Sequence, residues 1–508
     1  MFSQIYSAGV ETIDGYVVTV EVDASNGLPS FDIVGLPDLA VREARERVRA
    51  AIKNSGYDFK PIRLTVNLAP ADRKKEGASF DLPIFIGLLL ATKQLNVDVK
   101  GSAFIAELSL GGELLPVNGI LPMVIALKDA GIQNVFLSEE NAKEAAIIEG
   151  INVYAAANVN VIIQHLLGIS LIQRQQTVTY NPSAYYDDYL DYAEVAGQSL
   201  PKRAIEVAAS GGHNMLLIGP PGAGKSMLAK RLPSILPDMS FDEALETTKI
   251  HSIAGLLSSK NSFVSMRPIR MPHHTISYAG MAGGGAIPKP GELSLAHNGV
   301  LFLDELPEYN KMVLEVLRQP LEDGSVRISR ASGTAEYPCS FMLVCAMNPC
   351  KCGYYGHPTV PCTCKYSDVR KYLSKISGPL LDRIDIQVEV PGVTYAQLSE
   401  KTRGEKSVEI RKRVNAARKI QMRRFEGTNV HCNAQMTGDM VREYCILDSE
   451  ASLILQKIFD HNSLSARGYD RILKVGRTLA DMRKHTVIEV SDIVEAATYR
   501  ALDKKYFR

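Results

Sequence analysis

A phosphate-binding loop at residues 219–226 constrains the fold more than any other stretch of this chain. Its sequence, GPPGAGKS, matches the pattern G-x-x-x-x-G-K-[ST] at each specified position. The apolar residues 213–218 before it predict a buried strand, and residues 227–232 after it predict the start of a helix. A strand, a glycine turn and a helix N-terminus direct backbone N–H groups and the helix dipole at an anion. The alternative is a glycine-rich turn that carries a solvated lysine.

The expected ligand of this loop is a nucleoside triphosphate with magnesium. Lys225 is expected to reach the β- and γ-phosphates, and the Ser226 hydroxyl is expected to hold Mg²⁺. ATP and Mg²⁺ are therefore the predicted cofactors. The nucleotide-binding residues of the loop are Gly219, Pro220, Pro221, Gly222, Ala223, Gly224, Lys225 and Ser226.

Two further predicted strands deliver polar side chains toward the same site. Residues 300–303 are apolar and precede Asp304 and Glu305, so a buried strand brings two carboxylates to its end. Asp304 is expected in the Mg²⁺ shell, and Glu305 is expected to polarise the attacking water. A third apolar run, residues 341–347, ends at Asn348, which would orient that water. Each carboxylate is alternatively an acidic helix cap.

Composition limits the partners and the compartment. The 508 residues carry a formal net charge of +1, so binding to nucleic acid requires a local basic patch. The sequence has no apolar run of the ~18 residues that a membrane span needs. The first residues lack the basic and apolar regions of a signal peptide. We therefore expect a cytoplasmic protein without a membrane partner.

Four of the eight cysteines cluster in a turn-rich insert, residues 350–364. They form two C-x-C pairs, and four thiolates that converge from two short loops suit tetrahedral Zn²⁺. Iron–sulfur ligation and a redox pair are the alternatives. Basic residues lie within and just after the insert at Lys351, Lys365, Arg370 and Lys371, so it would either contact DNA or brace the subunit. The predicted ligands are Cys350, Cys352, Cys362 and Cys364.

The first 168 residues predict a mixed α/β domain. Residues 16–22 and 62–68 have the pattern of strands, and residues 41–54 and 81–90 have the pattern of helices. Because strands and helices follow one another in turn, we expect a sheet covered by helices.

Two segments of this domain resemble the protease domain of Lon. Residues 74–79, KKEGAS, are similar to the Lon segment that carries the nucleophilic serine, and residues 110–121 resemble a later segment. The resemblance implies a Lon-protease-like fold of the ribosomal S5 domain 2 type. Proteolysis there needs a lysine that activates the serine, but Leu121 stands at the aligned position. We expect no peptidase activity and interpret Ser79 as a turn or helix-cap residue; an active Lon-type peptidase is the alternative.

The nucleotide-site residues occur in an order that resembles the magnesium-chelatase branch of the AAA+ ATPases. The resemblance is carried by Asp304 with Glu305, by Asn348, and by the sequence Leu381-Asp382-Arg383. Over nearly the whole chain the sequence is similar to the bacterial ComM/YifB-type family, in which a Lon-like domain precedes a chelatase-type AAA+ module and a helical C-terminal domain. We expect an α/β fold with a Lon-like domain at 1–168, a linker at 169–192, an AAA+ core with a parallel sheet at 193–395, and a helical lid at 396–508.

The same resemblance implies an assembly and an activity. It implies a ring, expected to be a homohexamer, with nucleotide sites at the subunit interfaces. Arg383 would stabilise charge on the γ-phosphate of a neighbouring subunit, and Arg467 matches the second sensor arginine of the helical lid. Without the resemblance, Arg383 beside two aspartates has the pattern of a surface ion pair. Family members act as DNA helicases in branch migration during natural transformation, so we expect ATP hydrolysis coupled to movement on DNA.

Two inserts carry cations suited to phosphate contact. Residues 267–289 run from a basic into a glycine-rich segment, as a pore loop does, and residues 325–336 alternate like a hairpin with a turn at Ser332-Gly333. The hairpin is alternatively a solvated edge. His273 and His274 are expected to make polar contacts rather than to bind a metal. The candidate DNA contacts are Arg267, Arg270, Lys289, Arg327 and Arg330.

The rival interpretation is a protein-remodelling motor of the magnesium-chelatase type. Such motors usually present an aromatic–apolar pair in the pore, and Tyr278 with Met281 fits that description. A basic helix predicted over residues 408–425 is either a solvated face or a phosphate-facing stripe. The pore residues therefore decide between DNA and protein as the substrate.

Overall fold

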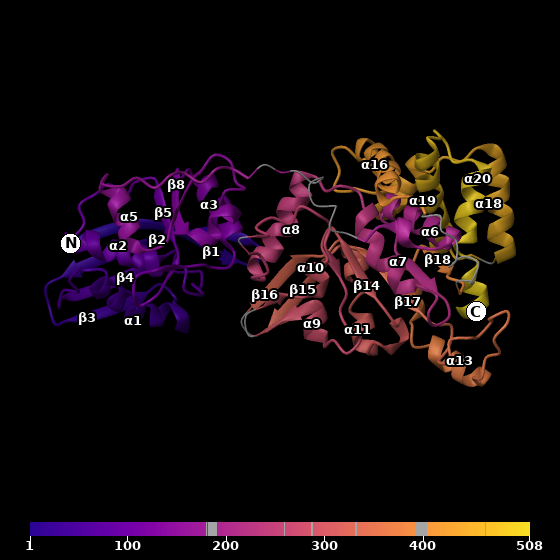
Figure 1. Cartoon of the computed structure of the whole chain (residues 1–508), viewed down its shortest axis with the longest axis horizontal. Helices are drawn as coiled ribbons and strands as arrows, with labels where there is room; N and C mark the ends of the chain where they lie inside the picture. Colours follow the sequence, from indigo (N-terminus) through magenta and orange to yellow (C-terminus); the bar gives the residue numbers. More distant parts are fainter. Residues whose placement is uncertain are drawn as a thin grey trace. The chain divides into compact units, whose positions relative to one another are not determined.

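The computed structural model describes residues 1–178, 180, 190–258, 260–285, 288–330, 333–392, 404–462 and 464–507 (Figure 1). The chain forms two compact units, Met1–Asn181 with Ala244–Val264 and Pro182–Glu243 with Ser265–Arg508. The expected boundaries at 168, 192 and 395 stay predictions. Residues 244–264, which the sequence places inside the nucleotide core, group with the N-terminal unit. Residues 181–189 of the expected linker lie outside the described residues.

The first unit is built on a seven-stranded mixed sheet with the order β3-β4-β2-β1-β5-β8-β9. β1, β2 and β4 pair antiparallel, and the remaining neighbours pair parallel. The strands are β1 Phe2–Glu11, β2 Asp14–Ser25, β3 Ser30–Val34, β4 Arg63–Ala69, β5 Ser102–Ile105, β8 Asn134–Ser138 and β9 Asn152–Ala156, with a separate pair β6 Glu107–Leu108 and β7 Leu114–Leu115. The helices are α1 Leu39–Asn54, α2 Asp81–Ala91, α3 Ile120–Asp129, α4 Ala142–Ala145, α5 Val159–Leu166 and, from Ala244 onward, α8 Phe241–Ile253.

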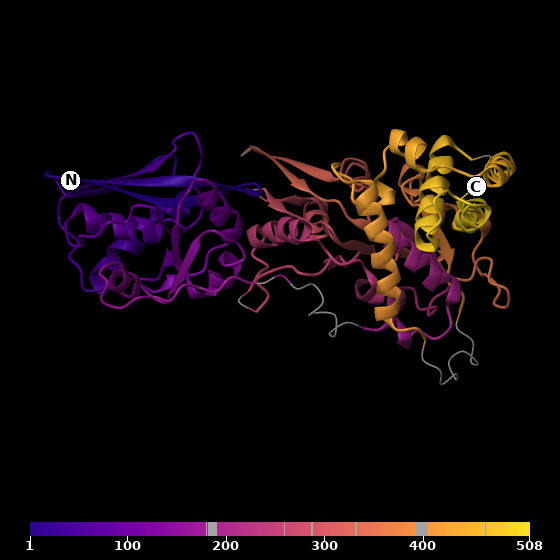
Figure 2. The same cartoon turned by 90° about the horizontal axis from the view of Figure 1, so that it is seen from above.

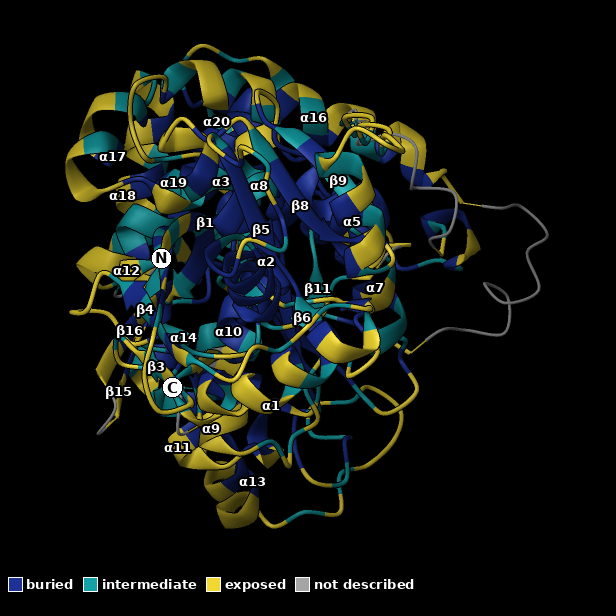
Figure 3. Ribbon diagram, turned by 90° about the vertical axis from the view of Figure 1, so that its left-hand side faces the viewer, coloured by how far each residue is buried: buried dark blue, intermediate teal, exposed yellow. Residues whose placement is uncertain are grey.

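Alternation and helical periodicity explain these elements. In β2, the side chains of Val18, Val20 and Val22 are buried on one face of the sheet. Asp38 is the N-cap of helix α1, and its carboxylate accepts a hydrogen bond from the Val41 backbone N–H at 2.8 Å. Helix α2 is buried along almost its whole length, as Figure 3 shows by its dark colour. The predicted α/β character of this unit is confirmed.

The two residues that decide the peptidase question are both buried. Ser79 lies in the turn before α2, and its Oγ has no hydrogen-bond partner among the described residues. The helix cap is Phe80, so the helix-cap alternative for Ser79 is wrong and the turn alternative is correct. Leu121 is fully buried in α3. Within the described part of the chain, no base is hydrogen-bonded to Ser79 Oγ, and the absence of peptidase activity stays a prediction.

The second unit contains a five-stranded sheet with the order β11-β14-β17-β10-β18, in which every pair is parallel. Its strands are β11 Ile269–Arg270, β14 Val300–Leu303, β17 Met342–Met347, β10 Met215–Ile218 and β18 Ile386–Glu389. The three central strands are wholly buried apolar runs, as a parallel sheet covered on both faces requires. Two antiparallel pairs lie outside this sheet: β12 Gly283–Gly284 with β13 Lys289–Pro290, and β15 Ser325–Arg330 with β16 Gly333–Pro338.

Helices surround this sheet and form the C-terminal part (Figure 2). Helix α7 follows the phosphate-binding loop, and the C-terminal helices share one hydrophobic core with the sheet. The helices with their bounds are α6 Ser199–Gly211, α7 Lys225–Arg231, α9 Tyr278–Ala282, α10 Glu292–Leu295, α11 Lys311–Glu315, α12 Pro320–Asp323, α13 Tyr366–Leu373, α14 Gly378–Leu381, α16 Ser407–Arg424, α17 Gly438–Tyr444, α18 Ser449–Asn462, α19 Ala466–Arg483 and α20 Val490–Thr498. None of the described helices combines the length and apolar character that a membrane crossing needs.

Candidate nucleotide site and cysteine cluster

Three adjacent strands end at the same edge of the second sheet, and each is followed by a predicted site residue. β10 leads into the loop that begins at Gly219, β14 leads to Asp304, and β17 leads to Asn348. Because β17 lies between β10 and β14, these three ends are neighbours. Ligand sites of open parallel sheets lie at this edge.

The glycines of the loop occupy positions that other residues fit poorly. Gly222 and Gly224 have positive φ angles of 75° and 89°. At Gly219 a Cβ would come within 2.2 Å of the Val390 carbonyl oxygen. Helix α7 then begins at Lys225, so its N-terminal N–H groups face the loop. The predicted strand, turn and helix start are confirmed.

Lys225 is held among oxygen atoms at the mouth of the loop. Its Nζ donates hydrogen bonds to the carbonyl oxygens of Gly219 and Pro220 at 2.8 and 2.9 Å, and to Asn348 Oδ1 at 3.0 Å. Burial lowers the pKa of the ammonium, and the carboxylates of Asp304 and Glu305 act in the opposite direction. The contact with Asn348 brings the phosphate-binding lysine and the predicted water-orienting amide together.

The two predicted magnesium ligands are also in contact. Ser226 Oγ donates a hydrogen bond to Asp304 Oδ2 at 2.5 Å. A hydroxyl and a carboxylate are hard oxygen ligands of the kind that Mg²⁺ takes, together with water and substrate phosphates. The donor set therefore fits the ion that the sequence predicts.

Glu305 lies close to His274, a neighbour that no sequence pattern predicts. Glu305 adopts a left-handed conformation with φ of 52°, and its side chain is exposed. His274 Nδ1 lies 3.7 Å from Glu305 Oε2, and the His274 ring faces His273 with centroids 4.1 Å apart. The predicted polar role of these histidines thus includes a partner at the nucleotide site. The pairing joins residues 31 positions apart, so no local pattern signals it.

Arg383 is largely buried and is bound within its own chain. It forms an ion pair with Glu322 of α12, and its Nη1 donates to the Pro379 carbonyl oxygen at 2.6 Å. The sequence-only alternative, an ion pair, is therefore present, but the partner is Glu322 rather than the flanking aspartates.

The predicted second sensor residue, Arg467, lies at the start of α19. Its side chain is exposed, and its Nη1 lies 3.6 Å from Asp382 Oδ2, next to Arg383 in the sequence. Close by, Asp385 contacts His213 at 3.1 Å and Arg471 of α19 at 3.3 Å. Burial raises the pKa of Asp385, but His213 and Arg471 outweigh it and hold the pKa at about 2. This segment is thus tied to α19 by charge.

The four clustered cysteines meet at one point. Their Sγ atoms all lie within 4.8 Å of one another, and Cys350, Cys352 and Cys362 are separated by 3.3 to 3.7 Å. Tetrahedral Zn–S bonds of about 2.3 Å place sulfur atoms about 3.8 Å apart. Burial raises the pKa of Cys352, but backbone N–H groups of Tyr354 and Thr363 outweigh it and bring the pKa to about 5. The sulfurs therefore fit a tetrahedral metal.

The two basic inserts lie against each other. Tyr337 of β16 donates a hydrogen bond to the Pro288 carbonyl oxygen at 2.8 Å, and a Cβ at Gly283 would meet Ile328 of β15 at 2.6 Å. The exposed cations of this lobe, which we call the basic lobe, are Lys289, Arg327 and Arg330. Arg327 pairs with Glu336 across the hairpin. Ser332 of the predicted turn lies outside the described residues.

The other two candidate DNA contacts have structural partners. Arg267 is largely buried, pairs with Glu243 at 2.9 Å, and donates to the Asn298 carbonyl oxygen at 2.7 Å. Arg270 forms a bidentate ion pair with Glu292. Arg267 therefore holds the fold together, and Arg270 keeps only partial exposure.

The basic helix of the C-terminal part, α16, is also engaged within the chain. Arg413 pairs with Glu206 and Glu405, and Arg424 pairs with Asp481. The basic side chains of α16 are therefore neither fully solvated nor fully available to phosphates.

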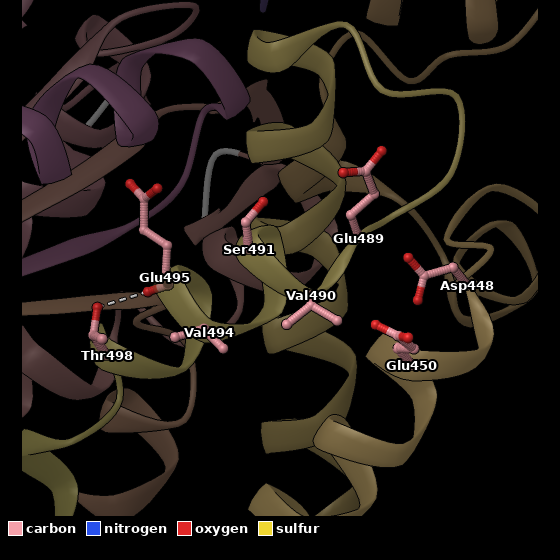
Figure 4. A pocket seen from close by; sticks show the side chains of 8 residues that line it. All are labelled: Asp448, Glu450, Glu489, Val490, Ser491, Val494, Glu495 and Thr498. Carbon is pink, nitrogen blue, oxygen red and sulfur yellow. Dashed lines mark hydrogen bonds between the residues drawn. The ribbon is translucent and has the colours of Figure 1, made fainter.

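An acidic hollow of about 750 Å³ lies among the C-terminal helices (Figure 4). It is lined by Asp448, Glu450, Glu489, Val490, Ser491, Val494, Glu495 and Thr498. The four carboxylates repel phosphate groups, and no residue of the phosphate-binding loop lines it. It is separate from the nucleotide site.

Comparison with known families agrees with this geometry. The family described as magnesium chelatase, subunit ChlI, matches residues 191–398. The ChlI subunit family matches residues 20–141, and the ChlI C-terminal family matches residues 404–500. These matches define the second unit as a magnesium-chelatase-type AAA+ module.

Relatives over the full length narrow the assignment. The competence protein ComM of Haemophilus influenzae is 41% identical over 98% of this chain and 97% of its own length. The YifB protein of Salmonella typhimurium is 41% identical over 96% of this chain and 94% of its own. A Lon protease of Cytophaga hutchinsonii is 28% identical over 137 residues, which are 26% of this chain and 17% of that protease. The chain belongs to the ComM/YifB-type branch of the magnesium-chelatase family, and the fold expected from the resemblance is confirmed.

Proposed function

We propose that this protein is a ring-forming, magnesium-dependent ATPase that couples ATP hydrolysis to movement on DNA, as a branch-migration helicase in natural transformation and recombination. The observation that carries the proposal is the set of contacts Lys225–Asn348 and Ser226–Asp304 at the edge of the parallel sheet. They occur in a chain with 41% identity to a competence protein over 98% of its length.

In the proposed reaction, each residue acts on a defined part of Mg-ATP. Bound magnesium would screen the phosphate charge, with Ser226 and Asp304 as its protein ligands. Lys225 exchanges carbonyl partners for the phosphates, which are stronger acceptors for an ammonium. Glu305 lies next to Asp304 and is exposed, so it can accept a proton from a water. Asn348, which accepts a hydrogen bond from Lys225, would orient that water.

The ring, proposed as a hexamer, completes the site with Arg383. In our proposal Arg383 leaves Glu322 and pairs with the γ-phosphate of the neighbouring subunit, where it stabilises transition-state charge. Its ion pair with Glu322 holds the side chain in place until then. Arg467 would act from α19, and its contact with Asp382 couples it to the Arg383 segment.

The basic lobe supports DNA as the substrate. It exposes Lys289 and Arg330, and Gly284 of β12 lies near both, since it pairs with Lys289 and a Cβ there would lie 3.0 Å from Arg330 Nη2. Cations of this kind follow phosphates in DNA motors. The rival protein-remodelling function needs an exposed aromatic–apolar pair. Tyr278 is exposed, but Met281 is fully buried, so the pair is not presented together.

We also propose that the cysteine cluster holds zinc. The convergence of all four sulfurs supports this. Purified protein is expected to contain about one zinc per chain, as a four-cysteine structural site does.

The proposal is tested with Holliday-type junctions and two site variants. Wild type with Mg-ATP is expected to displace strands from a branched DNA. Lys225→Ala should lose nucleotide binding, whereas Glu305→Gln should bind ATP and form rings but leave the junction intact. Junction movement by Glu305→Gln at the wild-type rate would contradict the assigned site.

A further inference from the structure

The four-cysteine insert, residues 350–364, contacts the phosphate-binding loop directly. Gly353 follows the predicted ligand Cys352 and is buried, with φ of 87°. A Cβ placed on Gly353 would lie 2.3 Å from Cδ and 2.7 Å from Cγ of Pro221. Backbone and proline ring are therefore in close contact, and only glycine satisfies both the spacing and the left-handed conformation.

The residues just before the insert reach the loop at a second point. Asn348 accepts a hydrogen bond from Lys225 and lies two residues before the predicted ligand Cys350. One short stretch thus holds the phosphate-binding loop through Asn348 on the lysine and through Gly353 on the proline. Cys350 and Cys352 lie between these two contacts.

Turns, a few side-chain contacts and the sulfurs order the insert. Between the end of β17 at Met347 and the start of α13 at Tyr366, the structure shows no helix or strand in these described residues. Its internal hydrogen bonds are turns, such as Gly353 N–H to the Cys350 carbonyl oxygen at 3.0 Å, and bonds to the His357 ring, such as Val360 N–H to Nδ1 at 3.0 Å. In segments of this kind, metal binding supplies the folding free energy.

We propose that the four-cysteine insert, with its metal bound, is a brace that positions the phosphate-binding loop, and that Gly353 is the positioning residue. Nucleotide affinity then depends on metal occupancy, although the metal contacts no nucleotide. The inference rests on the proposed ATP and zinc sites but concerns the contact between them.

Gly353→Ala tests the brace. The added Cβ collides with the ring of Pro221 and shifts the loop, so nucleotide affinity should fall by at least about tenfold, measured with a fluorescent ATP analogue without DNA. Zinc content should stay at the wild-type value. Gly356→Ala is the matched control: Gly356 lies in the same insert with φ of 74°, and its Cβ would lie 3.3 Å from Lys505 Cε and 3.9 Å from Tyr506 Oη, without the close collision found at Gly353.

The contact itself is tested by rescue. Pro221→Ala removes the ring atoms that collide, so Gly353→Ala in that background should cost less than about threefold in affinity. An affinity of Gly353→Ala equal to that of Gly356→Ala would overturn the brace, and so would a loss that Pro221→Ala does not relieve.

Metal removal gives a second test that does not depend on a variant. A zinc chelator applied to wild type should lower nucleotide affinity, and added zinc should restore it while the helical circular dichroism stays constant. Unchanged affinity after zinc loss refutes the brace. Failure of wild type to bind the ATP analogue at all would refute the proposed function instead, so the two failures are distinguishable.

Discussion

Lys225, Asp304 and Asn348 were predictable because each follows a short buried strand in a local pattern. The pattern fixes the strand, and the strand fixes where the side chain emerges, so contacts between residues 123 positions apart follow from sheet order alone. The pairing of His274 with Glu305 was not predictable, because residues 271–275 have no strand to place them. Arg383 was recognised by its motif, but its partner Glu322 lies in another element.

Glu144 carries a pH dependence that sequence patterns do not signal. It is buried in the first unit, and it accepts hydrogen bonds from the Leu121 backbone N–H at 3.0 Å and from Ser252 Oγ. Burial raises its pKa from 4.5 to about 7, and these hydrogen bonds oppose the rise. The folded chain therefore holds this proton more tightly than the unfolded chain does, so the contribution to stability is complete below about pH 4.5 and is lost as the pH rises through about 7.

Glu144→Gln should remove that dependence. Wild type loses this contribution as the pH rises, and the variant does not. The stability of the variant minus that of wild type should therefore increase by about 2 kcal/mol from pH 5 to pH 8. Thermal unfolding of both proteins at the two pH values measures the difference. Equal pH profiles for wild type and variant would show that Glu144 titrates normally.

At the scale of elements, alternation predicted the hairpin β15–β16 and the exposure of Arg327 opposite buried Ile328. It did not predict that the hairpin packs against the glycine-rich insert, since that packing depends on Tyr337 reaching Pro288. Of the five candidate DNA contacts, Arg267 and Arg270 pair with carboxylates inside the fold, and DNA contact stays a prediction for all five. Charge marks a cation in the sequence, whereas burial and pairing decide its role.

Arg267 and Arg330 should separate structural from DNA-binding cations. Arg267→Ala removes the ion pair with the largely buried Glu243 carboxylate and should cost about 3 kcal/mol of stability. Arg330→Ala should leave the unfolding temperature unchanged and weaken DNA binding, with a smaller salt dependence. Thermal unfolding and DNA titrations across salt measure both. Equal losses of DNA affinity in two stable variants would contradict this division of roles.

At the scale of the molecule, family resemblance predicted a Lon-like unit followed by a magnesium-chelatase-type module. It did not predict that residues 244–264, which lie within the nucleotide module in the sequence, belong to the first compact unit in the structure. Helix α8 is ordinary in sequence, and its assignment depends on long-range contacts such as Ser252 with Glu144. Composition and periodicity do not predict such long-range contacts.

Subunit mixing tests whether Arg383 acts on a neighbour. Arg383→Ala and Lys225→Ala should each abolish ATP hydrolysis alone, and mixing them should restore part of it, because some interfaces then combine an intact loop with an intact arginine. A mixture of Lys225→Ala with Glu305→Gln is the control and should stay inactive, since both residues belong to one subunit's site. Recovery in the control alone, or in neither mixture, would contradict the interface model.

The most direct test of the account is the ATPase rate of wild type with and without forked DNA, repeated across a salt series. We predict stimulation by forked DNA that fades steeply as salt rises, because phosphate contacts couple DNA to the motor. Hydrolysis without stimulation by any DNA at any salt concentration would contradict movement on DNA and favour a protein substrate.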